Sequence, residues 1–368
     1  IVINGSGSFF AEGTALKRIV FTVNSSDATT IGGTMTLDNV SSFHLKYCDL
    51  INMEAITPND GTPWDCIGDT IILDSCRVIN FSSLTFNAQV YGLIRGNIFQ
   101  QGGNCNFWND GWIIEGNRFV GIGGVSFFGG NQTITANSFS GSYLGFDGWG
   151  RNSGYSTTIS LNNISDGGGI GCLTYGVFLS ISSNNISGGG NILVNGNGQI
   201  INNTVENAEG SGITACGIWT IYGNAITTSK QSGIFLTGAA GINVVSHNTV
   251  TGNGFGTLPT APPYVNAGIA CMDSLFTIDS NIVTGNSNGV ICPSGSIVIN
   301  NDIHDNTNYD FMVAIYGITD VNAYNNWWGT TDTVQIHAKI YDYIGYQNSS
   351  RALIDPVAPA EIPGAGVR

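Results

Sequence analysis

The side chains that could catalyse a reaction gather in one stretch near the middle of the chain. Asp147 and Arg151 flank Trp149, and a further carboxylate, Asp110, lies upstream. Two carboxylates on either side of a bound sugar are the machinery of a glycoside hydrolase, whereas a polysaccharide lyase needs a basic residue that takes a proton. The competing interpretation, which we favour, is a salt bridge on a loop beside a packing tryptophan.

Aromatic residues supply a second candidate site, for binding rather than catalysis. Trp108 and Trp112 lie four residues apart, and with Trp149 they could form a platform on which sugar rings stack. Trp108 and Trp112 also occupy alternating strand positions, where a tryptophan more often packs against its neighbours. The sequence leaves both interpretations open.

Metal and cofactor chemistry has little support in the sequence. The four histidines are scattered without metal-ligand spacing, and no Cys-x-x-Cys pair occurs. Asp302, Asp305 and Asp310 could supply oxygen ligands to Ca²⁺, but they form no regular calcium-binding repeat. We therefore expect no cofactor and read these three residues as solvated turn carboxylates.

Charge and hydropathy argue against a nucleic acid partner and against a transmembrane segment. Only 10% of the 368 residues are charged, and the net charge is −14. Phosphate binding needs clustered Lys and Arg, so we expect no nucleic acid partner. The chain contains no run of eighteen apolar residues, so we expect no transmembrane segment.

An Asn–x–apolar triplet recurs along most of the chain, at intervals of 19 to 33 residues. A repeat of about this length with strand-forming residues and no helical period is typical of a solenoid. The asparagines of the series are Asn97, Asn117, Asn137, Asn162, Asn184, Asn203, Asn224, Asn248, Asn281, Asn301 and Asn325.

Each repeat has room for three short strands. One strand follows the asparagine, a second follows a glycine, and a third precedes the next asparagine. Three strands with turns between them make one coil of a right-handed parallel β-helix, an all-β fold in which equivalent positions superimpose about 4.8 Å apart. The repeating asparagines then point inward at one turn and bond to each other as a ladder, so we predict a structural role for them.

Cysteines occupy related positions. Cys48 and Cys76 replace the asparagine in two early triplets, and Cys271 and Cys292 lie 21 residues apart, which is one coil. We favour a buried stack of thiols for Cys271 and Cys292, and a disulfide between adjacent coils remains the alternative.

The domain organisation follows from the extent of the repeat. We predict a β-helix over residues 1–328, a C-terminal cap over 329–346 and an extended tail over 347–368. Thr331 and Asp332 form a helix N-cap signal, which predicts a short capping helix. Over-long intervals after Asn137 and Asn248 predict protruding loops, and among eight Asn-x-Ser/Thr sequons Asn348 is the best candidate for glycosylation.

Two segments resemble a known group of proteins. Residues 11–22, which include Ala11, Glu12 and Gly13, are similar to the first coil of the secreted right-handed parallel β-helix repeat proteins of bacteria and archaea. Residues 325–342, which begin Asn-Asn-Trp-Trp-Gly, are similar to their terminal coil and cap. The resemblance implies the fold, but the group serves as surface proteins, adhesins, sheath components and sugar-processing enzymes alike.

These observations lead to two functional hypotheses. The first is a secreted or cell-surface structural protein, a surface-layer, sheath or filament subunit or an adhesin-like scaffold that associates with itself. The second is a polysaccharide lyase, a glycoside hydrolase or a carbohydrate-binding β-helix that uses the region of Trp108, Trp112, Asp147 and Trp149. The polygalacturonase-like pattern of paired aspartates with Gly-His-Gly and Arg-Ile-Lys does not occur in the chain, so we favour the first.

Overall fold

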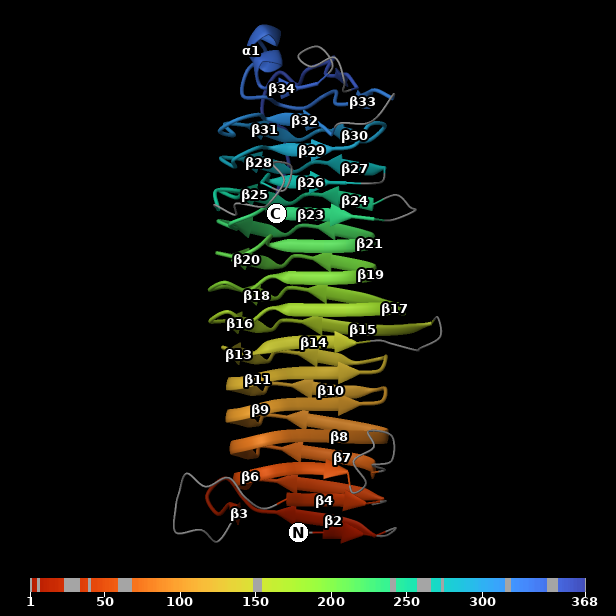
Figure 1. Ribbon diagram of the computed structural model, residues 1–368, viewed down its shortest axis with the longest axis vertical. Helices are drawn as coiled ribbons and strands as arrows, with labels where there is room; N and C mark the ends of the chain where they lie inside the picture. The colour runs from red at the N-terminus through yellow and green to blue at the C-terminus, as the bar shows by residue number, and fades with distance from the viewer. Residues whose placement is uncertain are drawn as a thin grey trace. The chain divides into compact units, whose positions relative to one another are not determined.

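The computed structural model describes residues 2–4, 7–22, 34–38, 41–58, 68–147, 154–238, 243–256, 266–272, 275–314, 319–342 and 350–367. They divide into two compact units, Ile1–Ser180 and Ile181–Arg368. Within each unit the chain coils so that each strand pairs in parallel with the equivalent strand of the next coil (Figure 1). The predicted parallel β-helix is therefore confirmed.

The strands of unit 1 form three stacks. Stack 1 follows the repeating asparagines, stack 2 comes next along the chain, and stack 3 leads into the next asparagine. Stack 1 contains β3 (Ile19–Thr22), β13 (Ser138–Ser140) and β16 (Asn163–Ser165); stack 2 contains β1 (Val2–Asn4), β4 (Thr34–Asp38) and β14 (Tyr143–Asp147); stack 3 contains β2 (Ser8–Glu12), β5 (Ser42–Lys46), β7 (Gly68–Asp74), β10 (Trp112–Glu115), β12 (Thr133–Thr135) and β15 (Tyr155–Ser160). Longer strands bend through more than one stack: β6 (Cys48–Pro58), β8 (Arg77–Arg95), β9 (Ile98–Trp108), β11 (Arg118–Phe128) and β17 (Ile170–Ser182), which carries the boundary after Ser180.

Unit 2 repeats the same three stacks. Stack 1 contains β18 (Asn185–Ile186), β20 (Thr204–Glu206), β22 (Ala225–Thr227), β25 (Thr249–Thr251), β28 (Ile282–Thr284) and β31 (Asp302–His304). Stack 2 contains β23 (Ile234–Thr237), β26 (Ile269–Cys271), β29 (Val290–Cys292), β32 (Phe311–Val313) and β34 (Ile340–Tyr341); stack 3 contains β24 (Asn243–Ser246), β27 (Phe276–Asp279), β30 (Ile297–Ile299), β33 (Val321–Asn322) and β35 (Ala352–Leu353). β19 (Ile192–Ile201) and β21 (Ile213–Tyr222) run through stacks 2 and 3.

The core of each coil is filled by alternate residues of these strands. In unit 1, Phe99, Phe119 and Phe139 stack with ring centroids 4.8 Å apart, and each is fully buried. Burying one such side chain contributes about 1.5–3 kcal/mol. Because equivalent positions superimpose, one apolar position in the repeat becomes a continuous column of the core.

The repeating asparagines form hydrogen-bonded ladders. In unit 2 the Asn203 backbone N and Nδ2 both donate to Asn224 Oδ1, at 2.9 and 3.0 Å. Asn224 donates to Asn248 in the same way. In unit 1, Asn97, Asn117 and Asn137 are linked by the same pair of bonds. All are buried, so each side chain satisfies polar groups at a bend that no strand partner reaches.

The last predicted rung was wrong by one residue. Asn301 donates to Asn326, which is fully buried, whereas Asn325 is exposed. The residue before each rung has a positive φ, which asparagine tolerates well, and Asn325 (φ 58°) fills that position. The true triplet is therefore Asn326, Trp327 and Trp328, with Trp328 buried in the apolar position.

A second ladder in unit 2 escaped the sequence analysis. Asn253 donates to Asn286 and Asn286 to Asn306, each through its backbone N and Nδ2 at 2.9–3.1 Å. Asn306 donates in the same way to the buried carboxylate of Asp310. The signal that could have revealed this ladder is the constant separation of five residues from the first ladder, as between Asn248 and Asn253.

The early cysteines serve as rungs without an amide. Asn97 Oδ1 accepts the backbone N–H of Cys76 at 2.7 Å, and the Cys76 thiol lies 3.4 Å from the Leu45 carbonyl oxygen. Cys271 and Cys292 are buried free thiols in β26 and β29. Among the described residues the structure therefore has the thiol stack that we favoured and not the disulfide.

Charged side chains form a further column on the outside of unit 1. Strand register superimposes Glu12, Lys46, Asp74, Arg95 and Glu115, so the sign of the charge alternates from coil to coil. Lys46 Nζ lies 2.7 Å from Glu12, and Arg95 Nη2 lies 2.7 Å from Asp74. Exposed pairs of this kind contribute little energy each, but the alternation disfavours a shift in register.

The C-terminal end of unit 2 is closed by a helix and by an ammonium group. α1 (Thr333–Ala338) has Asp332 as its N-cap, as predicted, and buries Ile336. Lys339 Nζ donates to the carbonyl oxygens of Asn306, Thr307 and Asn308, at 2.9, 3.1 and 3.3 Å. Lys339 thus supplies hydrogen bonds to carbonyl groups that have no following coil to bond to. No helix in the described part of the chain is long and apolar enough to cross a membrane.

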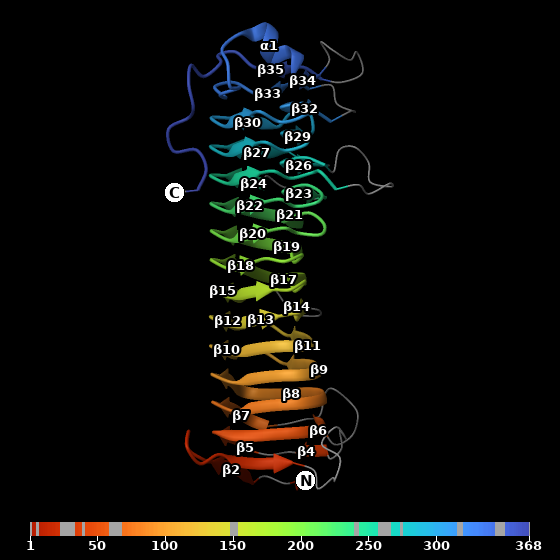
Figure 2. The same cartoon turned by 90° about the vertical axis from the view of Figure 1, so that its left-hand side faces the viewer.

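The described tail, residues 350–367, folds back along unit 2 as a strap (Figure 2). Ala358 N donates to Asn326 O, Ile362 N to Asp302 Oδ1 at 2.8 Å, Gly366 N to Ser280 O at 2.9 Å, and Val367 N to Thr249 Oγ1 at 3.0 Å. The strap therefore holds successive coils of its own unit. Asn348 lies outside the described residues.

The first part of one predicted loop is a strand. Residues 143–147 form β14 within stack 2, because Leu144 and Phe146 supply buried apolar positions at strand spacing. Residues 148–153 and 257–265, where the remaining protrusions were expected, lie outside the described part of the chain.

Candidate functional site

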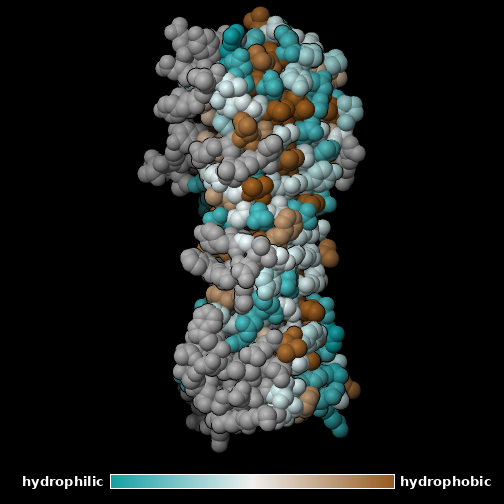
Figure 3. All heavy atoms as spheres, turned by 90° about the vertical axis from the view of Figure 1, so that its right-hand side faces the viewer, coloured by the Kyte–Doolittle hydropathy of each residue, from teal (hydrophilic) through white to brown (hydrophobic). Residues whose placement is uncertain are grey.

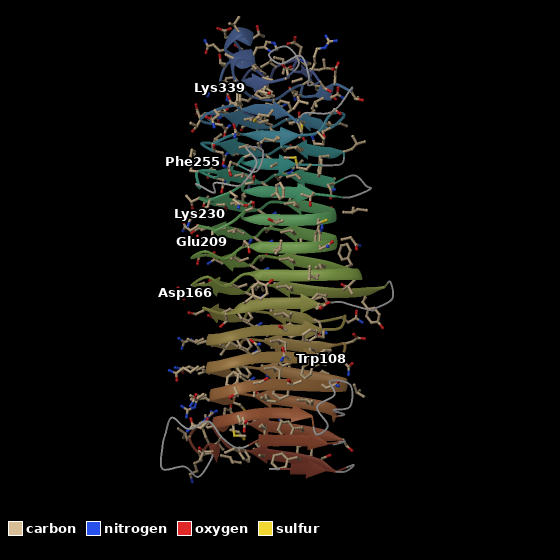
Figure 4. All side chains as sticks on the ribbon, in the orientation of Figure 1. Trp108, Asp166, Glu209, Lys230, Phe255 and Lys339 are labelled. Atoms are coloured by element: carbon tan, nitrogen blue, oxygen red, sulfur yellow. The ribbon has the colours of Figure 1, made fainter. Side chains whose placement is uncertain are left out.

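The candidate residues of unit 1 meet on the outer surface of stack 2, formed by β9, β11, β14 and the start of β17. Outward side chains on this surface include Asn106, Trp108, Ser126, Phe128, Tyr143 and Asp147, and we call it the outer face. The register superimposes Trp108, Phe128 and Asp147 on three successive coils. In unit 1, Figure 4 places Trp108 and Asp166 toward opposite edges of the coils.

Trp108 lies on this face as part of an aromatic pair. Its ring stacks on Phe128 with centroids 4.1 Å apart and planes 13° from parallel. Both rings are half-buried. One face of the indole is thus committed to Phe128, which fixes the orientation of the tryptophan while leaving part of it accessible.

Of the two interpretations of Trp112, the structure supports packing and contradicts the sugar platform. Its side chain is fully buried, and it contacts Phe107 with ring centroids 5.0 Å apart. The cause is strand alternation in β10, whose first residue points inward. The indole Nε1 donates to the Trp108 carbonyl oxygen at 2.8 Å, so the buried ring also satisfies its polar group.

The two candidate carboxylates have different surroundings. Asp110 Oδ1 accepts the backbone N–H of Gly130 at 2.6 Å, which ties it to the turn of the next coil. Asp147 is half-buried at the end of β14 and belongs to the outer face. Trp149 and Arg151 lie outside the described residues. The structure therefore places Trp108 and Asp147 on one face and Asp110 at the turn beside it.

Tyr143 is a member of this face that sequence reasoning missed. It is 43% exposed, yet its ring lies over the backbone of two glycines. A Cβ on Gly145 would lie 3.4 Å from Tyr143 Cε1, and a Cβ on Gly171 would lie 1.1 Å from the hydroxyl oxygen. Burial of the hydroxyl raises the pKa of Tyr143. Only the strand register, which sets Gly171 beside Gly145, reveals this arrangement.

The aspartates considered for Ca²⁺ have separate partners. Asp310 ends the second ladder, Asp302 accepts Ile362 N, and Asp305 lies 2.8 Å from His304 Nδ1. Asp302 and Asp310 are buried, so reading these two as solvated turn carboxylates was wrong. Burial raises the pKa of both. The described residues contain no group of three or more His, Cys, Asp or Glu side chains that could hold a metal ion.

Burial also suppresses the reactivity of the thiols of Cys76 and Cys292. Burial raises the pKa of Cys76 and of Cys292 to about 12. The thiolate is the reactive form, so these side chains act as core residues.

The comparisons agree with this architecture. Residues 103–274 match the family described as "Right handed beta helix region". The segment has the predicted fold. It contains most of the outer face and the first part of unit 2, and the family match carries no specific activity. No curated protein and no solved structure matches this chain.

Surface hydropathy adds no large apolar patch to these candidates on the side drawn in Figure 3. Its described hydrophobic residues form separate areas divided by polar ones. In unit 2, Figure 4 shows Glu209, Lys230, Phe255 and Lys339 along one edge of the coils. Glu209 pairs with Lys230 there, so this edge carries further contacts between coils.

Proposed function

We propose that this protein is an extracellular structural β-helix, a subunit of a surface layer, sheath or filament or an adhesin-like scaffold. The observation that carries the proposal is the use made of buried polar side chains. In both units the buried asparagines bond to each other and to backbone carbonyls along the coils. These side chains thus hold successive coils together, which is what a structural subunit requires.

Electron microscopy and light scattering of the purified protein test this proposal. We expect the full chain to self-associate into regular polymers or sheets. A monomer at all accessible concentrations, in the presence and absence of Ca²⁺, would contradict a filament or surface-layer role.

The second candidate is a polysaccharide-binding or polysaccharide-cleaving β-helix. The outer face favours it, because Trp108, Tyr143 and Asp147 offer two ordered aromatic rings and a carboxylate on a regular surface. Incubation with polysaccharides, followed by assay of new reducing ends and of unsaturated products, tests cleavage. Asp147→Ala should abolish any activity that uses this face, and activity unchanged by this substitution would place the reaction elsewhere.

A further inference from the structure

The outer face of unit 1 has glycines at several outward strand positions. Gly124, Gly145 and Gly171 occupy outward positions of β11, β14 and β17, where a sheet normally carries side chains. In their place, neighbouring side chains lie across the strands. Asn104 Oδ1 would lie 3.8 Å from a Cβ on Gly124 and 2.5 Å from one on Gly123. These side chains therefore cover the strand backbone at the glycine positions.

The ring of Tyr143 lies over two of these glycines, Gly145 and Gly171. The 1.1 Å separation between its hydroxyl oxygen and a Cβ built on Gly171 shows that any larger residue at position 171 would displace the ring. The ring is nevertheless 43% exposed. An aromatic ring that is both ordered and exposed binds a ligand at low entropic cost, because little freedom remains to be lost.

Polar groups continue the surface across the coils. Asn106, Ser126, Gly145 and Gly171 are superimposed by the register on four successive coils, about 4.8 Å apart. Asn106 and Ser126 are partly exposed. Amide and hydroxyl groups beside an aromatic ring suit a ligand that has hydroxyl groups on its edges and C–H groups on its faces, as a sugar has.

The charge of the face restricts which sugar polymer fits. Among the described outward side chains in the stack 2 portions of these four strands, Asp147 is the charged one. The protein as a whole carries −14. Uronic acid polymers would meet repulsion from both, whereas an uncharged polymer would not.

We propose that the outer face binds an uncharged polysaccharide that runs across the coils, with Tyr143 as the stacking residue and Asn106 and Ser126 as hydrogen-bonding residues. The inference rests on the second candidate function and specifies its ligand class. It requires no cleavage, and it is compatible with a scaffold that is anchored to a glycan.

Affinity electrophoresis tests the inference with three soluble polymers: hydroxyethylcellulose, a galactomannan and polygalacturonate. The wild-type full chain should be retarded by at least one of the two uncharged polymers and not by polygalacturonate. Tyr143→Ala should weaken the retarding interaction about 5- to 10-fold through loss of the stacking contact. Tyr143→Phe, which keeps the ring, should bind like wild type.

Two further variants separate positioning from general damage. Gly171→Ala should weaken binding as Tyr143→Ala does, since the added methyl group displaces the ring. Tyr324→Ala is the matched control, because Tyr324 is 39% exposed but belongs to unit 2, and it should bind normally. Circular dichroism on each variant establishes that the coils are intact.

The outcomes are distinguishable. Retardation by an uncharged polymer that Tyr143→Ala leaves unchanged overturns this inference while keeping polysaccharide binding. Preferential retardation by polygalacturonate overturns the ligand class. Absence of retardation by all three polymers overturns the inference, while the cleavage assay decides the second candidate function and microscopy decides the structural proposal.

Discussion

Replacement of Asn224 by alanine should loosen unit 2 locally, because this side chain is the acceptor for a neighbouring rung. Asn224 Oδ1 accepts both the backbone N–H and the Nδ2–H of Asn203, at 2.9 and 3.0 Å. Asn203 Nδ2 keeps other acceptors in Ile181 O and Ile201 O. The Asn203 backbone N–H would be left buried and unpaired.

The expected loss of stability follows from these lost hydrogen bonds. One orphaned buried donor costs about 1–3 kcal/mol, and the bonds that Asn224 Nδ2 makes to Ile200 O and Asn248 Oδ1 are lost as well. We expect a total loss of about 2–4 kcal/mol. Native-state hydrogen exchange should show this as faster exchange of the Asn203 amide, by roughly 30- to 700-fold.

The control is Asn325→Gly. Asn325 is exposed and has a positive φ that glycine adopts readily, so we expect a change of no more than about 0.5 kcal/mol. A change below about 1 kcal/mol for Asn224→Ala, or equal effects in both variants, would refute the ladder as a source of stability.

Three other perturbations have defined outcomes. Lys339→Met removes an ammonium group that bonds to three carbonyl oxygens, and amide exchange near Asn306 should reveal a loss of about 1–3 kcal/mol. Trp112→Ala should lower the free energy of unfolding by about 3–5 kcal/mol in urea titrations, whereas Trp108→Ala should cost less than about 1.5 kcal/mol because that ring is only half-buried. Acid should act oppositely around Asp49 in unit 1 and around Asp310 in unit 2. Burial acts to raise the pKa of Asp49, but its pairs with Arg77 and Arg18 outweigh burial and lower that pKa below 3.8, so its contribution is lost as pH falls through the lowered value. Burial raises the pKa of Asp310 above 3.8, so its contribution is present below 3.8 and is lost as pH rises through the raised value. Protection factors, which correct for the intrinsic pH dependence of amide exchange, should fall between pH 5 and pH 3 around Asp49 only, and a fall around Asp310 on acidification would contradict the assignment.

The fold was predictable because its determinants are local and repeated. A buried asparagine at a fixed place in each coil leaves the same mark in every repeat, so a short pattern identified the ladder at Asn97 and Asn224 alike. The pattern fails where the sequence offers two equivalent alignments. Asn325–Trp327 and Asn326–Trp328 both fit Asn–x–apolar, and only the positive φ of Asn325 selects the second.

The outer face was less predictable, because it depends on which residues of different coils become neighbours. Trp108 and Trp112 are both aromatic residues of one coil, but the turn between them reverses which side of the strand faces inward. Tyr143 becomes a fixed surface ring only because a glycine 28 residues later lies beneath it. Such a relation has no signature within a single repeat, since both residues are common in turns and strands.

The strap changes how unit 2 would respond to a mechanical load. A force applied at Val367 enters the molecule at the coil that contains Thr249, through the bond between Val367 N and Thr249 Oγ1, and not at the last coil. The strap's bonds to Thr249, Ser280, Asp302 and Asn326 must therefore break before the load reaches the last coil. A tether attached at Val367 would accordingly have to strip the strap from unit 2 before any coil unwinds.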